Sequence, residues 1–432
     1  MVGGGPAGMT AAARASETGR RVLLLEKNAV LGKKLLISGG GRCNVTNATS
    51  DRHVLVGRYG KDGKHLHSLF ARFGPEDTRT LLRRFGLETK VEAEGRVFPV
   101  TDRAASVRNV LEEYMRTTGV TIRRGCTVTG LVHDRAGSTE TPRIVAIQTA
   151  GGEEITARDF VLATGGTARP ETGSTGDAFS WLEALGIPVR LSESSLVPIR
   201  VPDQWVRGLQ GLALEDAELA VQRAYTPPSG PDRESWANVP RVLSRRGKLL
   251  FTHFGLSGPL ALNAASEIRD LAEHTSTEQR RIRLLVNPLP GTDPTDLERS
   301  ITTAASAEGR RTIGKQLRTL LPPRLAETVC GLAGVPPAER LATLSRASRR
   351  ILVTTLTAMP CGYGGLMGQE KAIVSSGGVD PAAVDFRTMR LRQIPNLFVL
   401  GDLLDFNRQS GGYSLQVCWA GGWVAGEALA ET

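Results

Sequence analysis

The stretch Val2-Gly-Gly-Gly-Pro-Ala-Gly-Met-Thr10 decides the fold, because its glycines are spaced Gly-x-Gly-x-x-Gly and open an alanine-rich segment. We expect a helix from Pro6 to about Thr18 and then a strand, Arg21–Glu26, that ends in an acidic residue. Glycines at this spacing permit a tight turn against a pyrophosphate, whose charge the helix N-terminus favours. With helix, strand and acid in register, the pattern predicts a Rossmann-type unit in which Glu26 accepts hydrogen bonds from ribose hydroxyls.

Only Met1 and Val2 precede this turn, where a dinucleotide-binding unit has a full strand. We expect that the recorded chain begins downstream of the true start. We also expect this form to bind its dinucleotide poorly or to fold marginally, because the neighbouring strands lose a pairing partner.

The other end of the chain carries a second signal in residues 401–416, Gly-Asp-Leu-Leu-Asp-Phe-Asn-Arg-Gln-Ser-Gly-Gly-Tyr-Ser-Leu-Gln. They follow an apolar run, Ile394–Leu400, that predicts a buried parallel strand. The carboxylate of Asp402 can accept a hydrogen bond from a ribityl or ribose hydroxyl. The double glycine lets the backbone approach a flat ring, and a helix starting near Ser414 would direct its positive end there, where an anionic reduced flavin is stabilised. The two ends together predict FAD as the cofactor.

Length and composition narrow the class of protein. The 432 residues suffice for two or three domains, and no stretch reaches the roughly 18 apolar residues of a membrane span. We expect a cytoplasmic protein, since the N-terminus enters the glycine turn without the features of a signal peptide. The five cysteines are odd in number and lack a Cys-x-x-Cys pair, so the sequence predicts neither a disulfide framework nor a metal site; they are Cys43, Cys126, Cys330, Cys361 and Cys418.

The net charge of +10 is concentrated in part between Gly309 and Arg350. This segment holds nine basic residues against two acids, Glu327 and Glu339, which indicates a surface that faces a polyanion. A solvated helical face is the alternative interpretation. The nine are Arg310, Arg311, Lys315, Arg318, Arg324, Arg340, Arg346, Arg349 and Arg350.

The pattern along the chain predicts an α/β fold with a discontinuous dinucleotide-binding domain. Residues 1–190 alternate strand and helix patterns, including a helix from Asp102 to about Thr118 and a buried strand, Phe160–Gly166, that ends in small residues. Residues 191–351 read as an insertion, β-rich over 191–293 and helical over 294–350, and residues 352–432 return to the first pattern.

Three internal blocks point to one family. They are Gly32-Lys-Lys-Leu-Leu-Ile-Ser-Gly-Gly-Gly-Arg-Cys-Asn-Val-Thr-Asn47, Gly165-Gly-Thr-Ala-Arg-Pro-Glu-Thr-Gly-Ser-Thr-Gly-Asp177 and Leu250-Phe-Thr-His-Phe-Gly-Leu-Ser-Gly-Pro259. With the C-terminal segment, they resemble the BaiN/RdsA family of bacterial FAD-dependent flavoproteins, also called the aminoacetone oxidase-like FAD-binding family. The resemblance spans nearly the whole chain. It implies a glutathione-reductase-type FAD domain carrying an inserted β-barrel and a helical subdomain.

Some positions depart from the family pattern. Gly401-Asp402 stands where Gly-Glu is usual, Ser414 replaces an asparagine, and the segment 407–409, Asn-Arg-Gln, replaces a more acidic one. The first change keeps a carboxylate, so we expect FAD binding to survive. The others lie near the expected isoalloxazine face and leave the substrate open.

The cofactor-binding residues expected from these blocks are Gly3, Gly5, Pro6, Ala7, Gly8, Glu26, Lys27, Lys34, Ser38, Gly39, Gly40, Gly41, Arg42, Asn44, Val128, Ala163, Thr164, Gly165, Gly166, Gly401, Asp402, Gly411, Gly412, Tyr413, Ser414 and Gln416.

The resemblance also implies reduction of a conjugated C=C bond, by hydride transfer from reduced flavin N5 to the carbon β to a carbonyl and protonation of the α carbon by a general acid. Cys43 is the first candidate for that acid, with Arg42 to stabilise charge and Asn44 to bind an amide edge. The alternative is that Arg42 and Asn44 cradle FAD while Cys43 packs. His253 and Tyr413 are further candidates as donors, although His253 could equally be structural.

Three functions remain open at this point. The first is a reductase that takes electrons from NADPH or NADH and acts on uridine of ribosomal RNA, bound through Arg310, Arg311, Lys315, Arg318, Arg346, Arg349 and Arg350. The second is a small-molecule flavoenzyme, either an enone reductase or an amine oxidase. The third is a flavin-bearing RNA-binding factor without turnover. No second glycine fingerprint is present for a nicotinamide, which we therefore expect to react over the flavin.

Overall fold

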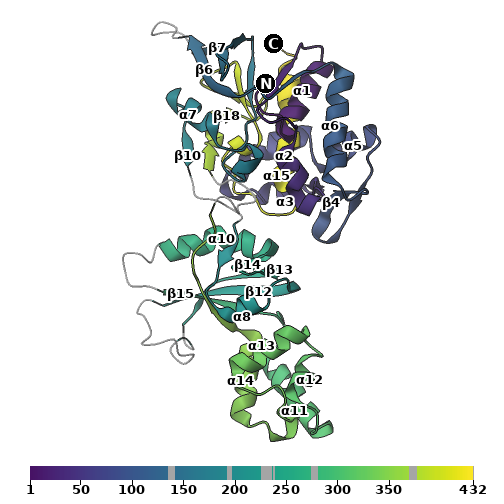
Figure 1. Cartoon of the computed structure of the whole chain (residues 1–432), viewed down its shortest axis with the longest axis vertical. Helices are drawn as coiled ribbons and strands as arrows, with labels where there is room; N and C mark the ends of the chain where they lie inside the picture. The colour runs from purple at the N-terminus through teal and green to yellow at the C-terminus, as the bar shows by residue number, and fades with distance from the viewer. Residues whose placement is uncertain are drawn as a thin grey trace. The chain divides into compact units, whose positions relative to one another are not determined.

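The computed structural model describes residues 1–134, 142–191, 197–224, 236, 239–273, 281–368 and 377–431. They form two compact units (Figure 1). The first unit consists of Met1–Leu196 and Gly368–Thr432, and the second of Val197–Met367. A discontinuous first unit thus carries the second as an insertion in its sequence.

The boundaries predicted at residues 191 and 352 differ from this division. β10 (Val189–Leu191) still pairs with β17 (Gly377–Val379) in the first unit. α14 (Arg346–Thr357) runs through residue 352, and β16 (Met359–Gly362) then joins the sheet of the second unit. Residues 352–367 therefore belong to the second unit. The sequence pattern changes near residue 352, but α14 continues to Thr357, so the change in pattern does not mark the boundary.

The central layer of the first unit consists of two pairs of parallel strands that are joined through a single residue, Val2. β1 (Leu23–Glu26) pairs with β5 (Thr121–Arg124), and β9 (Phe160–Leu162) pairs with β20 (Leu397–Val399). Val2 lies between the two pairs and forms parallel bridges to Leu25 and Leu162. Its N–H donates to Val161 O and its carbonyl accepts from Ala163 N–H, both at 2.8 Å. The position of the central strand is thus held by the residues just before the glycine turn.

The remaining elements of the first unit surround this layer. β19 (Arg390–Leu391) and β18 (Val384–Asp385) extend its β20 edge. Two antiparallel sheets add β2 (Thr46–Asn47), β4 (Arg96–Pro99) and β3 (Thr89–Val91), and then β6 (Val128–Asp134), β7 (Arg143–Thr149) and β8 (Glu154–Thr156). The helices are α1 (Pro6–Glu17), α2 (Lys33–Ile37), α3 (Arg52–Gly57), α4 (His67–Arg72), α5 (Pro75–Arg84), α6 (Ala104–Thr118), α7 (Asp177–Ala184) and α15 (Tyr413–Ala428). α6 begins two residues later than predicted, because Asp102 has a positive φ of 51° that a helix cannot contain.

α1 and α15 pack against each other through small residues. α1 is alanine-rich and buried along most of its length. On α15, a Cβ added at Gly422 would lie 2.6 Å from the carbonyl oxygen of Ala7, and one at Gly426 would lie 2.6 Å from Cβ of Arg14. The two backbones therefore approach more closely than any larger residue permits, which sets α15 relative to the glycine turn.

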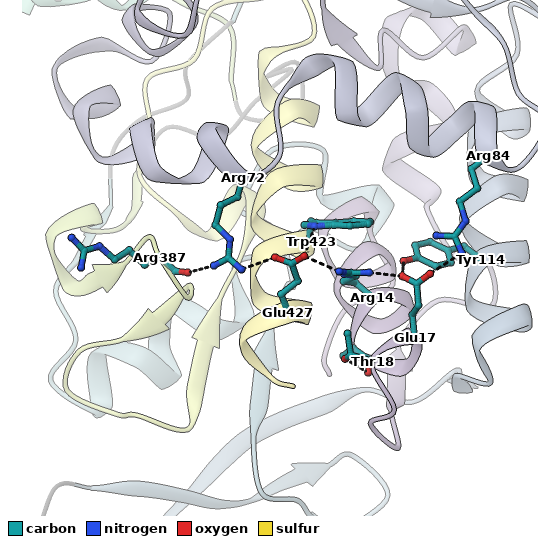
Figure 2. Close-up of polar contacts among 10 residues, drawn as sticks. Arg14, Glu17, Thr18, Arg72, Arg84, Tyr114, Arg387, Trp423 and Glu427 are labelled. Atoms are coloured by element: carbon teal, nitrogen blue, oxygen red, sulfur yellow. Dashed lines mark hydrogen bonds and ion pairs between the residues drawn. The ribbon is translucent and has the colours of Figure 1, made fainter. Parts of the chain in front are cut away.

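An ion-pair network closes the opposite end of this helix pair (Figure 2). Arg14 of α1 bridges Glu17 at 2.8 Å and Glu427 of α15 at 2.7 Å, and its guanidinium lies 4.1 Å from the centre of the Trp423 ring. Arg72 of α4 reaches Glu427 from the other side at 2.6 Å. The network ties α1, α4 and α15 together. Arg14, Glu17 and Glu427 are half-buried, which reduces solvent screening, whereas Arg72 is exposed.

The second unit combines one antiparallel sheet with helices. The sheet order is β11 (Ile199–Arg200), β14 (Gly255–Ser257), β13 (Arg241–Phe251), β12 (Ala213–Ala224), β15 (Arg281–Asn287) and β16. The helices are α8 (Gln204–Gly208), α10 (Gly258–Glu273), α11 (Pro294–Ala307), α12 (Ile313–Leu317), α13 (Pro323–Ala333) and α14. This unit has its own apolar core. Closure of its sheet into the barrel that the resemblance implies stays a prediction. Among the helices that the structure describes, none combines the length and apolar character that a membrane span requires.

Two neighbouring glycines of α15 test the helix contact. We expect Gly422→Ala to lower the free energy of unfolding by about 1–3 kcal/mol, because its methyl group would overlap the backbone of α1. At Gly421 the same methyl group would make ordinary contacts with Met389 Cε at 3.5 Å and Leu400 Cδ2 at 3.9 Å, so Gly421→Ala should be neutral or stabilising by up to about 1 kcal/mol. Urea denaturation of both variants measures the difference. Equal effects would contradict the proposed close contact.

Candidate functional site

The three fingerprint glycines of the turn before α1, Gly3, Gly5 and Gly8, differ in what a side chain at each position would meet. Gly3 has a φ of 103°, and a Cβ there would overlap the carbonyl of Ala163. A Cβ at Gly8 would overlap the carbonyl of Gly3. At Gly5, the N-cap of α1, an added Cβ would meet nothing within 4 Å, and the φ of −82° suits any residue. Packing thus explains Gly3 and Gly8, whereas Gly5 leaves open space at the helix N-terminus, where an anion is favoured.

Glu26 ends β1 beside this turn and is buried. Its Oε2 accepts from the N–H of Gly4 at 2.7 Å, and its Oε1 accepts from the backbone and side-chain nitrogens of Asn28, each at 2.7 Å. Glu26, the residue predicted to bind a ribose, is therefore held against the glycine turn. Lys27, by contrast, forms an ion pair with Asp177 at the start of α7 at 2.7 Å.

The end of β9 lies against the same turn and is built from small residues, as predicted. Ala163 contacts Gly3 and Gly8, and Gly165 follows with a φ of 80°. The hydroxyl oxygen of Thr164 is buried and has no hydrogen-bond partner in the part of the chain that the structure describes. A buried hydroxyl without a partner is costly, so Thr164 has hydrogen-bonding capacity available for a ligand. Val128, at the start of β6, is buried and apolar.

The glycine loop after α2 exposes its backbone. Gly39, Gly40 and Gly41 all have positive φ, and an added Cβ at Gly40 would meet nothing within 4 Å. Ser38 donates to the carbonyl of Leu35 at 2.7 Å. Asn44 Oδ1 accepts from the backbone N–H of Val97 at 3.2 Å, which anchors the loop to β4.

Cys43 lies within this loop but points into the protein. Its side chain is fully buried, and burial raises the pKa of the thiol to about 12. Its φ of 63° is rare for a residue with a side chain. This arrangement fits the packing alternative better than the role of proton donor.

Arg42 is paired with two acids, Glu92 directly after β3 and Asp102 between β4 and α6. Its guanidinium forms hydrogen bonds with Glu92 and Asp102, which raise the pKa of Arg42 further, and it stacks 4.1 Å from the Phe98 ring centre. Lys90 also contacts Asp102. The positive charge of Arg42, which the sequence predicts to stabilise developing negative charge, is therefore already paired with the carboxylates of Glu92 and Asp102.

Asp402 sits between two cations. Lys34 Nζ donates to its Oδ2 at 2.9 Å, and Arg408 Nη1 donates to its Oδ1 at 2.6 Å. Burial works to raise the pKa of Asp402, but the charges of Lys34 and Arg408 outweigh it and lower the pKa to about 2. Asp402 and Lys34 were predicted site residues, whereas the sequence analysis missed Arg408. The chain between the two residues contains no regular helix or strand beyond the short turn at 401–403, so no local period reveals this pair.

The double glycine precedes α15 as predicted, and the helix begins at Tyr413 rather than Ser414. Gly412 is the N-cap, with a φ of 99° and no room for a Cβ against the backbone of Thr46. Tyr413 is buried, and its carbonyl accepts from the hydroxyl of Tyr59 at 2.8 Å. Ser414 lies on the first turn of the helix and is half-buried.

Gln416 turns away from this helix end. Its Oε1 accepts from the hydroxyls of Thr46 and Thr78 at 2.6 and 2.9 Å, and its Nε2 donates to the carbonyl of Phe73 at 3.2 Å. This fully buried amide joins α15 to β2 and α5. These contacts give Gln416 a structural purpose beside its predicted role with the cofactor.

Three of these segments meet in space although they are far apart in sequence. Gly401, with a φ of 68°, lies beside Ala7 of α1, where an added Cβ would be 3.1 Å from Ala7 Cβ. Lys34 of α2 reaches Asp402, and the turn before α1 rests on Ala163. The open space at Gly5, the exposed glycine loop and the unpartnered Thr164 hydroxyl fit a phosphate-bearing dinucleotide bound along these segments.

The other predicted residues belong to the second unit. His253 is exposed between β13 and β14, with its ring 4.8 Å from that of Phe254. Among the basic residues, Arg311 pairs with Glu308 at 3.4 Å and Arg318 with Glu327 at 2.6 Å, and Arg349 donates to the carbonyl of Leu344 at 3.4 Å. Arg324 donates to the carbonyls of Gly208 and Gln210. Within the described ranges, five exposed cations of this segment have neither an ion pair nor a side-chain hydrogen bond: Arg310, Lys315, Arg340, Arg346 and Arg350.

These five cations lie on connected parts of the helical segment. The residue after Arg311 bridges Arg340, since Thr312 and Arg340 form an isolated antiparallel bridge. Arg346 and Arg350 are one turn apart on α14, and Lys315 is on α12. We refer to Arg310, Lys315, Arg340, Arg346 and Arg350 as the helical basic surface.

Comparison with known proteins gives a consistent result. A family model described as HI0933-like protein Rossmann domain matches residues 1–428. A ribosomal RNA dihydrouridine synthase of Escherichia coli is 30% identical over 99% of this chain and 97% of that protein. A 3-dehydro-bile acid delta(4,6)-reductase of Clostridium scindens is 27% identical over 100% of this chain and 98% of that protein.

Solved structures support the fold. A 3-ketosteroid delta1-dehydrogenase of Sterolibacterium denitrificans aligns with a TM-score of 0.56 at 12% identity, covering 100% of this chain and 98% of that one. The matches confirm the predicted fold class and the resemblance stated from the sequence blocks.

The role of Gly5 leads to a test in which stability and binding respond in opposite directions. We expect Gly5→Asp to leave the apoprotein at least as stable, because aspartate is a favoured N-cap and nothing lies in its way. FAD affinity should fall by about ten-fold or more, since the carboxylate would repel a pyrophosphate at the same place.

Thermal denaturation of the apoprotein and fluorescence titration with FAD measure the two effects. Gly5→Ser, which also caps the helix but adds no charge, separates bulk from charge. Undiminished FAD affinity in Gly5→Asp would place the pyrophosphate elsewhere.

Proposed function

We propose that this chain, which belongs to the HI0933-like family, is an FAD-dependent oxidoreductase that uses NADPH or NADH to reduce uridine in ribosomal RNA to dihydrouridine. The observation that carries the proposal is the similarity, over nearly the whole of both chains, to a protein named for this reaction. The geometry of the first unit supports the flavin part, through the open glycine turn and the paired carboxylate at residue 402.

The residues of the first unit have distinct roles in this proposal. The N-terminus of α1 and the open space at Gly5 would hold the pyrophosphate, Glu26 the adenosine ribose, and Asp402 a ribityl hydroxyl. Bound FAD, once reduced by NADPH or NADH, would supply a hydride for a carbon conjugated with a carbonyl. The N-terminus of α15 would favour negative charge on the ring.

The proton that completes the reduction needs a donor from the protein or from water. Cys43 is buried, and its raised pKa makes it a poor acid. Tyr413, at the first position of α15, and His253, exposed in the second unit, remain the proposed donors. Arg42 would contribute charge only by exchanging one of its carboxylate partners.

The helical basic surface supports an RNA substrate. Phosphate contacts dominate the affinity of proteins for RNA, and cations without carboxylate partners are available for them. Strand β13 offers a contrast in the same unit, since each of its four cations pairs with a carboxylate: Arg241 with Glu218, Arg245 with Glu267, Arg246 with Asp216 and Lys248 with Glu215.

A second candidate is reduction of a small enone. The relative named as a bile acid reductase favours it, because that protein matches this chain over a similar length. The two candidates share hydride transfer to a conjugated carbon and differ in whether a polyanion must bind.

The test of the substrate is the dihydrouridine content of ribosomal RNA, measured by mass spectrometry in cells with and without the gene. We expect one dihydrouridine to disappear on deletion. It should return with the wild-type gene but not with Gly5→Asp, which makes flavin binding causal. Unchanged RNA would remove this proposal and direct the search to small enones, beginning with NADPH oxidation by the purified flavoprotein.

The helical basic surface has its own test. We expect the variant Arg310→Gln/Lys315→Gln/Arg346→Gln/Arg350→Gln to bind ribosomal RNA about ten-fold or more weakly. The slope of log affinity on log salt should fall by about 3, as for the loss of four phosphate contacts.

The matched control replaces Arg241, Arg245, Arg246 and Lys248 by glutamine, which removes the same charge from β13. Because those cations are already paired, RNA binding should change less. Equal losses in the two quadruple variants would show that net charge, and not this surface, governs binding.

A further inference from the structure

Arg408 is a fully buried cation in the first unit, with 1% of its side chain exposed. Its Nη1 donates to Asp402 at 2.6 Å, and its Nη2 donates to the carbonyls of Gly401 and Leu404 at 3.1 and 2.9 Å. A guanidinium is desolvated at great cost, and such a site requires partners that match its planar fork. Here one guanidinium binds a side chain and both ends of the turn that carries it.

This turn has little freedom of its own. Gly401 adopts a left-handed conformation between Ala7 of α1 and Cys418 of α15, where an added Cβ would lie 3.1 and 3.3 Å from their side chains. Residues Gly401–Leu403 form a short 3-10 turn directly after β20. By binding both ends of it, Arg408 fixes the direction in which the Asp402 carboxylate leaves the backbone.

The Asp402 carboxylate is held by two cations and can still accept further hydrogen bonds. Lys34 binds Oδ2 and Arg408 binds Oδ1. Each carboxylate oxygen has two lone pairs, so a further donor can be accepted on either oxygen. Arg408 also keeps one buried donor, Nε, without a partner among the described residues. The Asp402 carboxylate is therefore held in place by Lys34 and Arg408, and the cluster can still form further hydrogen bonds.

A purely structural role is a poor explanation of this arrangement. Buried ion pairs contribute little to stability compared with apolar residues of the same volume, because desolvation offsets the attraction. The turn is already restricted by its contacts with α1 and α15. What an arginine adds is the orientation of one carboxylate.

We propose that Arg408 is a positioning residue of the flavin site: its fork to Asp402 and to the carbonyls of Gly401 and Leu404 presents the Asp402 carboxylate to a ribityl hydroxyl of FAD. This inference rests on the flavin part of the proposed function and is independent of the substrate. Arg408 acts through Asp402, so the effects of replacing either residue should not add.

The experiment measures FAD dissociation constants by fluorescence titration of the apoproteins, together with their thermal midpoints. We expect Arg408→Gln and Asp402→Asn each to weaken FAD binding by about ten-fold or more. The dissociation constant of the double variant for FAD should lie within about two-fold of that of Asp402→Asn. Arg408→Lys keeps the charge but loses the fork, so its affinity should lie between Arg408→Gln and wild type.

Arg58 provides the matched control, because its Nη1 donates to Gln409 Oε1 at 3.1 Å beside Arg408 and does not reach Asp402. Arg58→Gln should retain wild-type affinity. A loss in Arg408→Gln that recurs in full in the Asp402→Asn background would overturn the proposal, as would an affinity within two-fold of wild type.

If Arg408→Gln does not fold, the comparison of Arg408→Lys with wild type in both Asp402 backgrounds decides the same question. A wild-type protein that binds no FAD would instead overturn the flavin part of the proposed function.

Discussion

The close approach of backbone to backbone at the glycine turn is the constraint on which the first unit depends. Gly3 lies on the carbonyl of Ala163, and Gly8 lies on the carbonyl of Gly3, so the start of α1 is fixed at the ends of β1 and β9. α15 then packs on α1 through Gly422 and Gly426. Both helix N-termini relevant to the proposed site are therefore placed by residues that lack a side chain.

The charged groups around this turn are restrained before any ligand is considered. Glu26 accepts hydrogen bonds from the turn itself, and Asp402 is held between Lys34 and Arg408. Carboxylates fixed in this way lose little conformational freedom when a hydroxyl binds, which favours affinity. The exposed glycine loop differs, because its backbone is open and its neighbouring cation, Arg42, is shared with Glu92 and Asp102.

The second unit separates two kinds of positive charge. Each arginine and lysine of β13 pairs with a carboxylate of β12 or α10, and such pairs carry little net field. On the helical basic surface the cations have no such partners within the described ranges, so their field extends to a distance set by the salt concentration. A formal net charge of +10 does not distinguish the two arrangements.

The sequence by itself determined the Rossmann-type fold, the family and most of the residues around the glycine turn. These follow from local spacing: glycines at fixed intervals, a helix and strand in register, and blocks whose residues are contiguous. Only the tertiary structure showed that Gly5 alone among the turn's glycines faces open space, that Cys43 is buried, and that Arg408 pairs with Asp402. Those facts depend on which distant segments meet, and burial and ion pairing arise from that meeting rather than from any spacing along the chain.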